Sequence, residues 1–145
     1  MDSKKYNEDL REVWRPNWLT SINELTCLNL QKRSWLDTKA SSPHWTYVEF
    51  MCCYFDGLAI DNNYKDPLER GLISLEEFEI IKDWHEQLDK YEEPNKDCYN
   101  VRKILDDPKW LEIIEIGLIA KSKLGQILNE VERQILFAKI DYEKM

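Results

Sequence analysis

The stretch 43–57, PHWTYVEFMCCYFDG, constrains the fold most, because only Glu49 in its middle is charged. Ser42 followed by Pro43 is typical of an N-cap with proline at the first helical position. Gly57 is suited to end the helix in a left-handed conformation. A helix that is apolar on almost every face needs other elements around it. We therefore expect a central apolar helix at about 43–57, with a buried strand as the alternative interpretation.

Apolar residues at helical spacing predict further helices on both sides of this stretch. Upstream, the spacing predicts a helix over 3–14, an interruption at Pro16, and a second helix over about 16–36. Downstream, a run of turn-forming residues predicts a loop, with a short helical turn at 67–70.

Two more helices are predicted after this loop. Ser74 and Glu77 have the spacing of a capping box in front of a helix over about 75–91. Its inward positions by periodicity are Phe78, Ile81, His85, Leu88 and Tyr91. A short helix over 97–106 follows it.

A long regular pattern closes the chain. Asp107 and Pro108 repeat the cap-then-proline signal, and apolar residues then recur every three or four positions as far as Val131. The pattern predicts one helix to about Lys139, or two helices broken near 122–125. Gly117 and Gly125 are positions where another helix can approach closely.

These elements define the predicted fold class. No segment alternates with the period of two that is typical of a half-buried strand, and no internal repeat is found. The length of 145 residues corresponds to one ordinary domain with a real core. We therefore predict a single all-α domain, 1–145, built as a bundle of five to seven helices around the central apolar helix.

Composition limits the class of protein. The sequence has no run of about 18 apolar residues and begins with a polar stretch, which predicts neither a membrane span nor a signal peptide. The spacing of the four cysteines fits neither a disulfide framework nor a zinc site, so we expect buried, reduced thiols in a cytoplasmic protein. The cysteines are Cys27, Cys52, Cys53 and Cys98.

The net charge of −8 is concentrated in the middle of the chain. Residues 49–107 contain sixteen Asp and Glu against seven Lys and Arg, whereas the flanking parts are close to neutral. Such a block argues against binding to nucleic acid or to an anionic membrane. It suits a basic protein partner, which it attracts at long range. The other interpretation is a solvated acidic surface that serves solubility.

The acidic block contains the candidate partner-binding residues. The intervals between Glu76, Glu79, Asp83 and Glu86 place four carboxylates on one exposed helix face, where like charges repel. Further acidic residues follow the central helix, and nearby aromatic residues, including Tyr54, are candidate anchors. The complete set of candidates is Asp56, Asp61, Tyr64, Asp66, Glu76, Glu79, Asp83, Trp84 and Glu86.

No motif predicts a metal, a cofactor or a catalytic site. The segment 66–77 has the outline of a calcium loop, but Leu68 and Arg70 stand where oxygen ligands are required. His44 and His85 are too few for most metal sites, and no nucleophile or phosphate-loop pattern is found. We therefore expect a protein that is not an enzyme and that binds no cofactor.

Three stretches resemble the small acidic immunity proteins of bacterial toxin–immunity systems, including those of contact-dependent growth inhibition. They are YVEFMCCYFDGLAIDNNY, GLISLEEFEIIKDWHEQLDKY and ILDDPKWLEIIEIG. The likeness is one of style, with an aromatic-rich helix, an acidic middle and a late helix that contains tryptophan. It implies a cytoplasmic protein that blocks the active site of one cognate toxin domain. Toxins of this kind are often basic nucleases. The resemblance implies that an acidic face covers such a nuclease by imitating its nucleic-acid substrate.

Two alternatives remain open at the level of sequence. One is an accessory or regulatory subunit that binds a partner helix in a groove. The other is a helical enzyme with a polar pocket around His44 or His85. The sequence predicts no oligomeric state.

Overall fold

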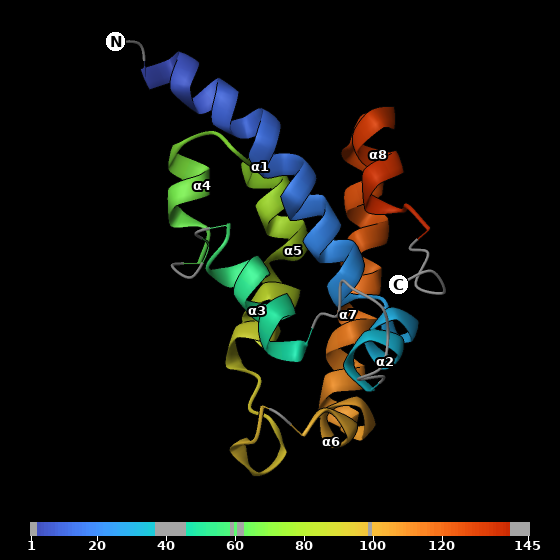
Figure 1. The fold of residues 1–145 in the computed structure, drawn as a ribbon. Coiled ribbons are helices and arrows are strands. Elements are labelled where there is room, and N and C mark those ends of the chain that lie inside the picture. The colour runs from blue at the N-terminus through green and yellow to red at the C-terminus, as the bar shows by residue number, and fades with distance from the viewer. Residues whose placement is uncertain (1–2, 37–45, 59, 61–62, 99, 140–145) are drawn as a thin grey trace.

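The structure is a computed structural model that describes residues 3–36, 46–58, 60, 63–98 and 100–139, and Figure 1 shows them as an all-α bundle. The predicted fold class is confirmed, with eight α-helices in the described residues where five to seven were expected. In chain order they are α1 (Ser3–Leu25), α2 (Leu28–Leu36), α3 (Tyr47–Phe55), α4 (Lys65–Glu69), α5 (Leu75–Lys90), the 3₁₀ helix η1 (Pro94–Lys96), α6 (Val101–Asp106), α7 (Pro108–Ile127) and α8 (Glu130–Leu136).

The most extensive contact between two helices joins α5 and α7, which run in opposite directions. Gly117 of α7 permits this close packing, because a Cβ atom there would lie 2.6 Å from Nε1 of Trp84 and 2.7 Å from Cγ2 of Thr26. The predicted close approach at Gly117 is thus confirmed. Gly125 meets Phe137, just after α8, in the same way.

Helix α1 crosses this pair and passes through Pro16 without a break, so the predicted interruption at Pro16 is wrong. Proline inside a helix removes one backbone hydrogen bond and costs about 3 kcal/mol or more. Trp14, Trp18 and Leu19 are buried on both sides of it. Burying a large apolar side chain contributes about 1.5–3 kcal/mol, so this continuous apolar face outweighs the local cost.

Helix α3 begins later than predicted. Thr46 is its N-cap in an extended conformation, and Thr46 and Glu49 form a capping box, so the helix does not start at Pro43. The proposed cap Ser42 and residues 43–45 lie outside the described residues. At the other end Asp56 is the C-cap, and Gly57 is not among the residues with positive φ, so its predicted left-handed role is wrong.

Helix α3 is also less central than its sequence predicts. Tyr47, Phe50 and Tyr54 are buried, whereas Cys52 and Cys53 are exposed. The helix therefore packs one side on the core and against α1, and its other side is exposed. All four cysteines are unpaired, as expected, but the prediction that they are buried is wrong, since Cys52 and Cys53 are exposed and Cys27 and Cys98 are only half-buried.

The second half of the chain follows the sequence pattern closely. The capping box at Ser74 and the Asp107 cap of α7 are confirmed, and the helical turn predicted at 67–70 is found as α4, which begins two residues earlier and ends at Glu69. The break after α7 lies at 128–129 and not at 122–125, because the Asn129 side chain caps α8 by accepting a hydrogen bond from the backbone of Glu132. None of the described helices is long and apolar enough to cross a membrane.

Candidate protein-binding surface

The outer side of α5 is lined by carboxylates. Glu76, Glu79 and Asp83 are exposed and Glu86 is half-buried, while the opposite side of the helix faces the core, as its periodicity predicts. These four residues are named the acidic face. Their side chains make no hydrogen bond or ion pair with any residue that the structure describes. The negative charge of the acidic face is therefore not neutralised by that part of the chain.

The other predicted acidic residues do not join this face in the same way. Asp66 forms an ion pair with Arg70, whose Nε lies 3.0 Å from each carboxylate oxygen, so its charge is matched locally. Asp56 is exposed at the end of α3. Asp61 lies outside the described residues.

The predicted aromatic anchors are not on the surface. Tyr64 is 0% exposed and Trp84 is 1% exposed, so assigning them to a partner-binding surface is wrong. Tyr54 is likewise 0% exposed. Burial of the two tyrosine rings is worth more to the core than their hydroxyl groups cost, because these groups find hydrogen-bond partners there.

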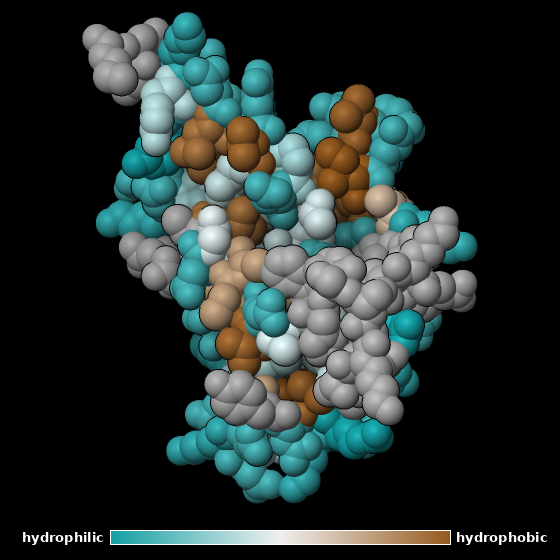
Figure 2. Space-filling view, in the orientation of Figure 1, coloured by the Kyte–Doolittle hydropathy of each residue, from teal (hydrophilic) through white to brown (hydrophobic). Residues whose placement is uncertain are grey.

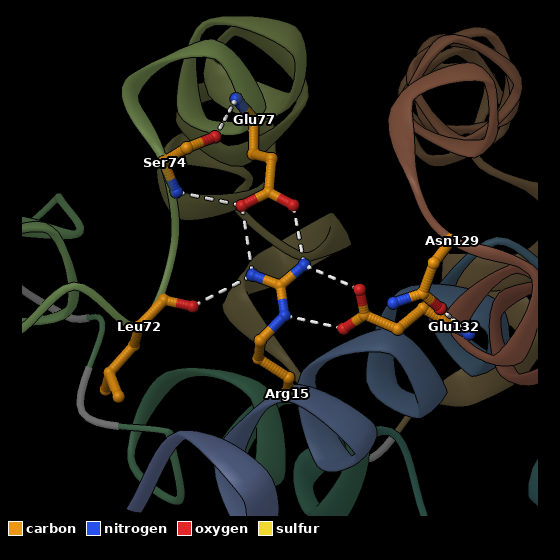
Figure 3. A network of polar contacts seen from close by, with 6 residues as sticks. All are labelled: Arg15, Leu72, Ser74, Glu77, Asn129 and Glu132. Carbon is orange, nitrogen blue, oxygen red and sulfur yellow. Dashed lines mark hydrogen bonds and ion pairs between the residues drawn. The ribbon is translucent and has the colours of Figure 1, made fainter. Parts of the chain in front are cut away.

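Arg15 holds the beginning of α5 in place (Figure 3). Its Nη atoms donate to the two oxygens of Glu77 over 2.9 and 2.6 Å, and Nη1 also donates to the backbone oxygen of Leu72 over 2.9 Å. Nε and Nη2 donate to Glu132 of α8 over 2.6 and 3.2 Å. All five N–H groups of a guanidinium are thereby used. Three separate elements, α1, α5 and α8, are fixed around one cation.

The capping box of α5 is part of the same network. One oxygen of Glu77 accepts the backbone N–H of Ser74 over 2.8 Å, and the Ser74 hydroxyl accepts the backbone N–H of Glu77 over 3.1 Å. Burial alone raises the pKa of Glu77, but the hydrogen bonds and charge of Arg15 outweigh burial and hold this pKa below its usual value. Glu77 is therefore ionised and paired at neutral pH.

A second buried network begins at Trp18 of α1, next to Arg15. The indole Nε1 of Trp18 donates to the hydroxyl of Tyr64 over 3.0 Å, and that hydroxyl lies 2.6 Å from the hydroxyl of Tyr54. The Tyr54 hydroxyl lies 2.9 Å from Nδ1 of His85. The four side chains connect α1, the segment before α4, α3 and α5.

His85 is enclosed by this network and is 2% exposed. Burial lowers its pKa, against the attraction of Asp89 and Glu86, so the imidazole is neutral at pH 7. The polar pocket around His85 that an enzyme would need is not formed, since its ring packs against those of Tyr54, Phe55 and Tyr64. His44 lies outside the described residues.

A groove of about 590 Å³ separates α1 from α8. The groove is lined on the α1 side by Arg11, Glu12 and Pro16 and on the α8 side by Val131 and Ile135. The ion-paired Arg15 and Glu132 also line it. Val131 is 68% exposed. Figure 2 shows apolar surface on the α8 side of this view, whereas the end of the molecule near η1 and α6 is hydrophilic.

Sequence reasoning missed the residues that organise these networks. Arg15, Glu77 and Glu132 are far apart in the chain, and nothing local pairs them. The available signal is the position of Arg15 between Trp14 and Trp18, on the apolar side of a helix, where a charge needs partners. No group of three or more His, Cys, Asp or Glu side chains in the described part of the chain is placed to hold a metal ion.

Comparison of the chain with protein-family models, with curated proteins and with solved structures finds no match.

Proposed function

We propose that the chain is an immunity protein that binds a basic toxin domain, most concretely a nuclease, through the acidic face of α5. The observation that supports this function is the row of carboxylates at Glu76, Glu79, Asp83 and Glu86 without ion-pair partners among the described residues. Like charges at these intervals destabilise a helix by about 0.2–0.5 kcal/mol per pair, a cost that binding of a basic surface would remove.

A rigid support favours this face as an interface. The capping box and the three hydrogen bonds of Arg15 to Glu77 and Leu72 fix the start of α5, and α7 packs along its inner side. A preorganised helix loses little conformational entropy on binding. We also propose that the protein acts in the cytoplasm, where the exposed thiols of Cys52 and Cys53 stay reduced.

Charge reversal tests the assignment of the face. We expect the Asp83→Lys, Glu86→Lys double variant to lose the partner, because two repulsive contacts replace two attractive ones at the interface. The matched control is Glu112→Lys with Glu115→Lys, which makes the same change of net charge on the exposed side of α7. Both variants should keep the helical circular dichroism of the wild type. Their free energy of unfolding should stay within about 0.5 kcal/mol of the wild-type value. Equal loss of the partner in both variants would reject the acidic face as the binding surface.

The groove between α1 and α8 supports a second candidate, an accessory subunit that binds a partner helix. An exposed apolar residue, Val131, beside an open groove is typical of a surface that receives an amphipathic helix. This function predicts that Val131→Asp abolishes binding, that charge reversal on α5 does not, and that binding depends weakly on salt.

A further inference from the structure

Hydrogen bonds link the buried side chains of Trp18, Tyr64, Tyr54 and His85 in series. Every donor in this series finds an acceptor only if all the bonds run from Trp18 towards His85. An indole N–H can only donate, so the oxygen of Tyr64 accepts from Trp18. The proton of Tyr64 then points to the oxygen of Tyr54, and the proton of Tyr54 points to Nδ1 of His85. His85 is the final acceptor, which requires that Nδ1 carries no proton.

A proton on Nδ1 of His85 reverses the chain. Nδ1–H then donates to Tyr54, and Tyr54 donates to Tyr64, whose oxygen already accepts from Trp18. The hydroxyl proton of Tyr64 is left without an acceptor among the described residues, in a side chain that is 0% exposed. A buried donor without a partner destabilises the arrangement that encloses it.

Tyr64 is the residue that this conflict would displace. It precedes α4 with φ of 64°, a left-handed conformation that a bulky residue adopts only when its surroundings hold it there. Its ring packs against Phe78 and His85 of α5. At the far end of the same segment, Leu72 accepts a hydrogen bond from Arg15, which does not titrate, so pH acts on this segment through Tyr64.

The charges around His85 come from several elements. On α5 itself, Asp89 and Glu86 favour the imidazolium. Tyr54 and Phe55 of α3 and Tyr64 present uncharged rings. On α1, the guanidinium of Arg15 lies 5.3 Å from the centre of the Trp18 ring and is paired with Glu77 and Glu132. Burial opposes protonation of His85, so the switch operates on the acidic side of neutrality.

We propose that His85 is a pH-sensitive latch whose protonation at Nδ1 releases Tyr64 from the core and opens the segment 63–73, including α4, while the α5–α7 pair stays packed. This inference does not depend on the proposed function, because it concerns the core side of α5 and no partner takes part in it.

Hydrogen exchange resolved by residue, on the full chain between neutral pH and about pH 5, tests the latch. Exchange rates are converted to protection factors so that the intrinsic pH dependence of exchange is removed. We expect the equilibrium constant for opening of 63–73 to rise as the pH falls. The rise should be up to about tenfold for each pH unit of decrease, in the range between the pKa values of His85 in the open and closed forms. Amides of α7 should keep their protection. A loss of protection that is equal in both regions, or absent from both, would overturn the proposal.

Two variants separate His85 from the other histidine of the chain. His85→Gln keeps an acceptor that cannot be protonated, so protection of 63–73 should no longer depend on pH. His44→Gln removes the second imidazole and should keep the wild-type response. If His85→Gln does not fold, the titration of the His85 imidazole resonance, followed by NMR in the wild-type protein, tests the latch instead. Its titration midpoint must coincide with the loss of protection at 63–73, and titration without that loss would reject the latch.

Discussion

The α5–α7 interface and the contact between α1 and the α3–α5 connection are held together in different ways. Between α5 and α7, Trp84 packs against Gly117, and its buried indole N–H has no hydrogen-bond partner among the residues that the structure describes. Between α1 and the connection, three α1 side chains act as donors. Trp14 donates to the backbone oxygen of Leu58 over 2.8 Å, Trp18 to the hydroxyl of Tyr64, and Arg15 to the backbone oxygen of Leu72.

The difference shows two uses of the same residue type. At position 84 tryptophan supplies volume to a regular helix pair, and its nitrogen makes no hydrogen bond with the described residues. At positions 14 and 18 tryptophan supplies a directed N–H to the chain between α3 and α5, at the backbone oxygen of Leu58 and the hydroxyl of Tyr64. Apolar packing positions helices, whereas polar contacts position the irregular chain between them.

The largest effect is expected in the apolar region. Trp84→Ala should lower the free energy of unfolding by about 3–5 kcal/mol, because it leaves a cavity beside Gly117. Chemical denaturation measures this loss. Trp84→Phe is the control, and it should retain most of the stability because no hydrogen bond is removed. A large loss in Trp84→Phe would contradict the view that this tryptophan acts through volume.

The next effect belongs to the polar region. Arg15→Met should lower the free energy of unfolding by about 3 kcal/mol, because Glu77 stays buried without its cation. Denaturation at neutral pH provides the measurement, and the segment 63–73 should lose hydrogen-exchange protection before α7 does. Uniform loss of protection would mean that Arg15 does not hold this segment separately.

A smaller difference in stability is expected between tryptophan that donates a hydrogen bond, at position 18, and tryptophan that only fills space, at position 84. Trp18→Phe removes the same atoms as Trp84→Phe and in addition leaves the Tyr64 oxygen without its donor. We expect Trp18→Phe to cost about 1 kcal/mol more than Trp84→Phe, the usual contribution of one hydrogen bond. Equal costs in parallel denaturation curves would remove the distinction between volume and donor.

The smallest predicted effect is a pH dependence from Glu77. Its pKa is lower in the folded chain than the usual 4.5, so the unfolded state binds more protons in this range. The stabilisation by Glu77 is therefore complete above about pH 4.5 and is lost as the pH falls through the folded-state pKa. Thermal unfolding at a series of acidic pH values measures it. In Arg15→Met the same decline should be weaker.

The regular part of the fold is predictable from sequence because its signals are local. The Ser74–Glu77 capping box, the Asp107–Pro108 start and the inward positions of α5 follow from short patterns, and the structure confirms them. The prediction of a break at Pro16 is wrong because it uses a local rule. The residues on both sides of Pro16 are buried by tertiary packing, which the local rule does not include. Gly57 fails because Asp56 already ends α3.

The candidate surface was predictable only in part. The outward direction of Glu76, Glu79 and Asp83 follows from helical periodicity alone. Burial of Tyr64 and Trp84 does not, because an aromatic residue suits a core and an interface equally well. The Arg15 network joins residues more than fifty positions apart, and no pattern in one sequence encodes such a pairing.

The most direct test of the proposed function is retention of a partner on the immobilised wild-type chain at low and at high salt, with lysate from the source organism and mass spectrometry of the eluate. The proposal predicts one basic protein that is held at low salt, weakened at high salt because exposed charges are screened, and absent with the Asp83→Lys, Glu86→Lys variant. A partner that is held equally at both salt concentrations and by that variant would contradict binding through the acidic face.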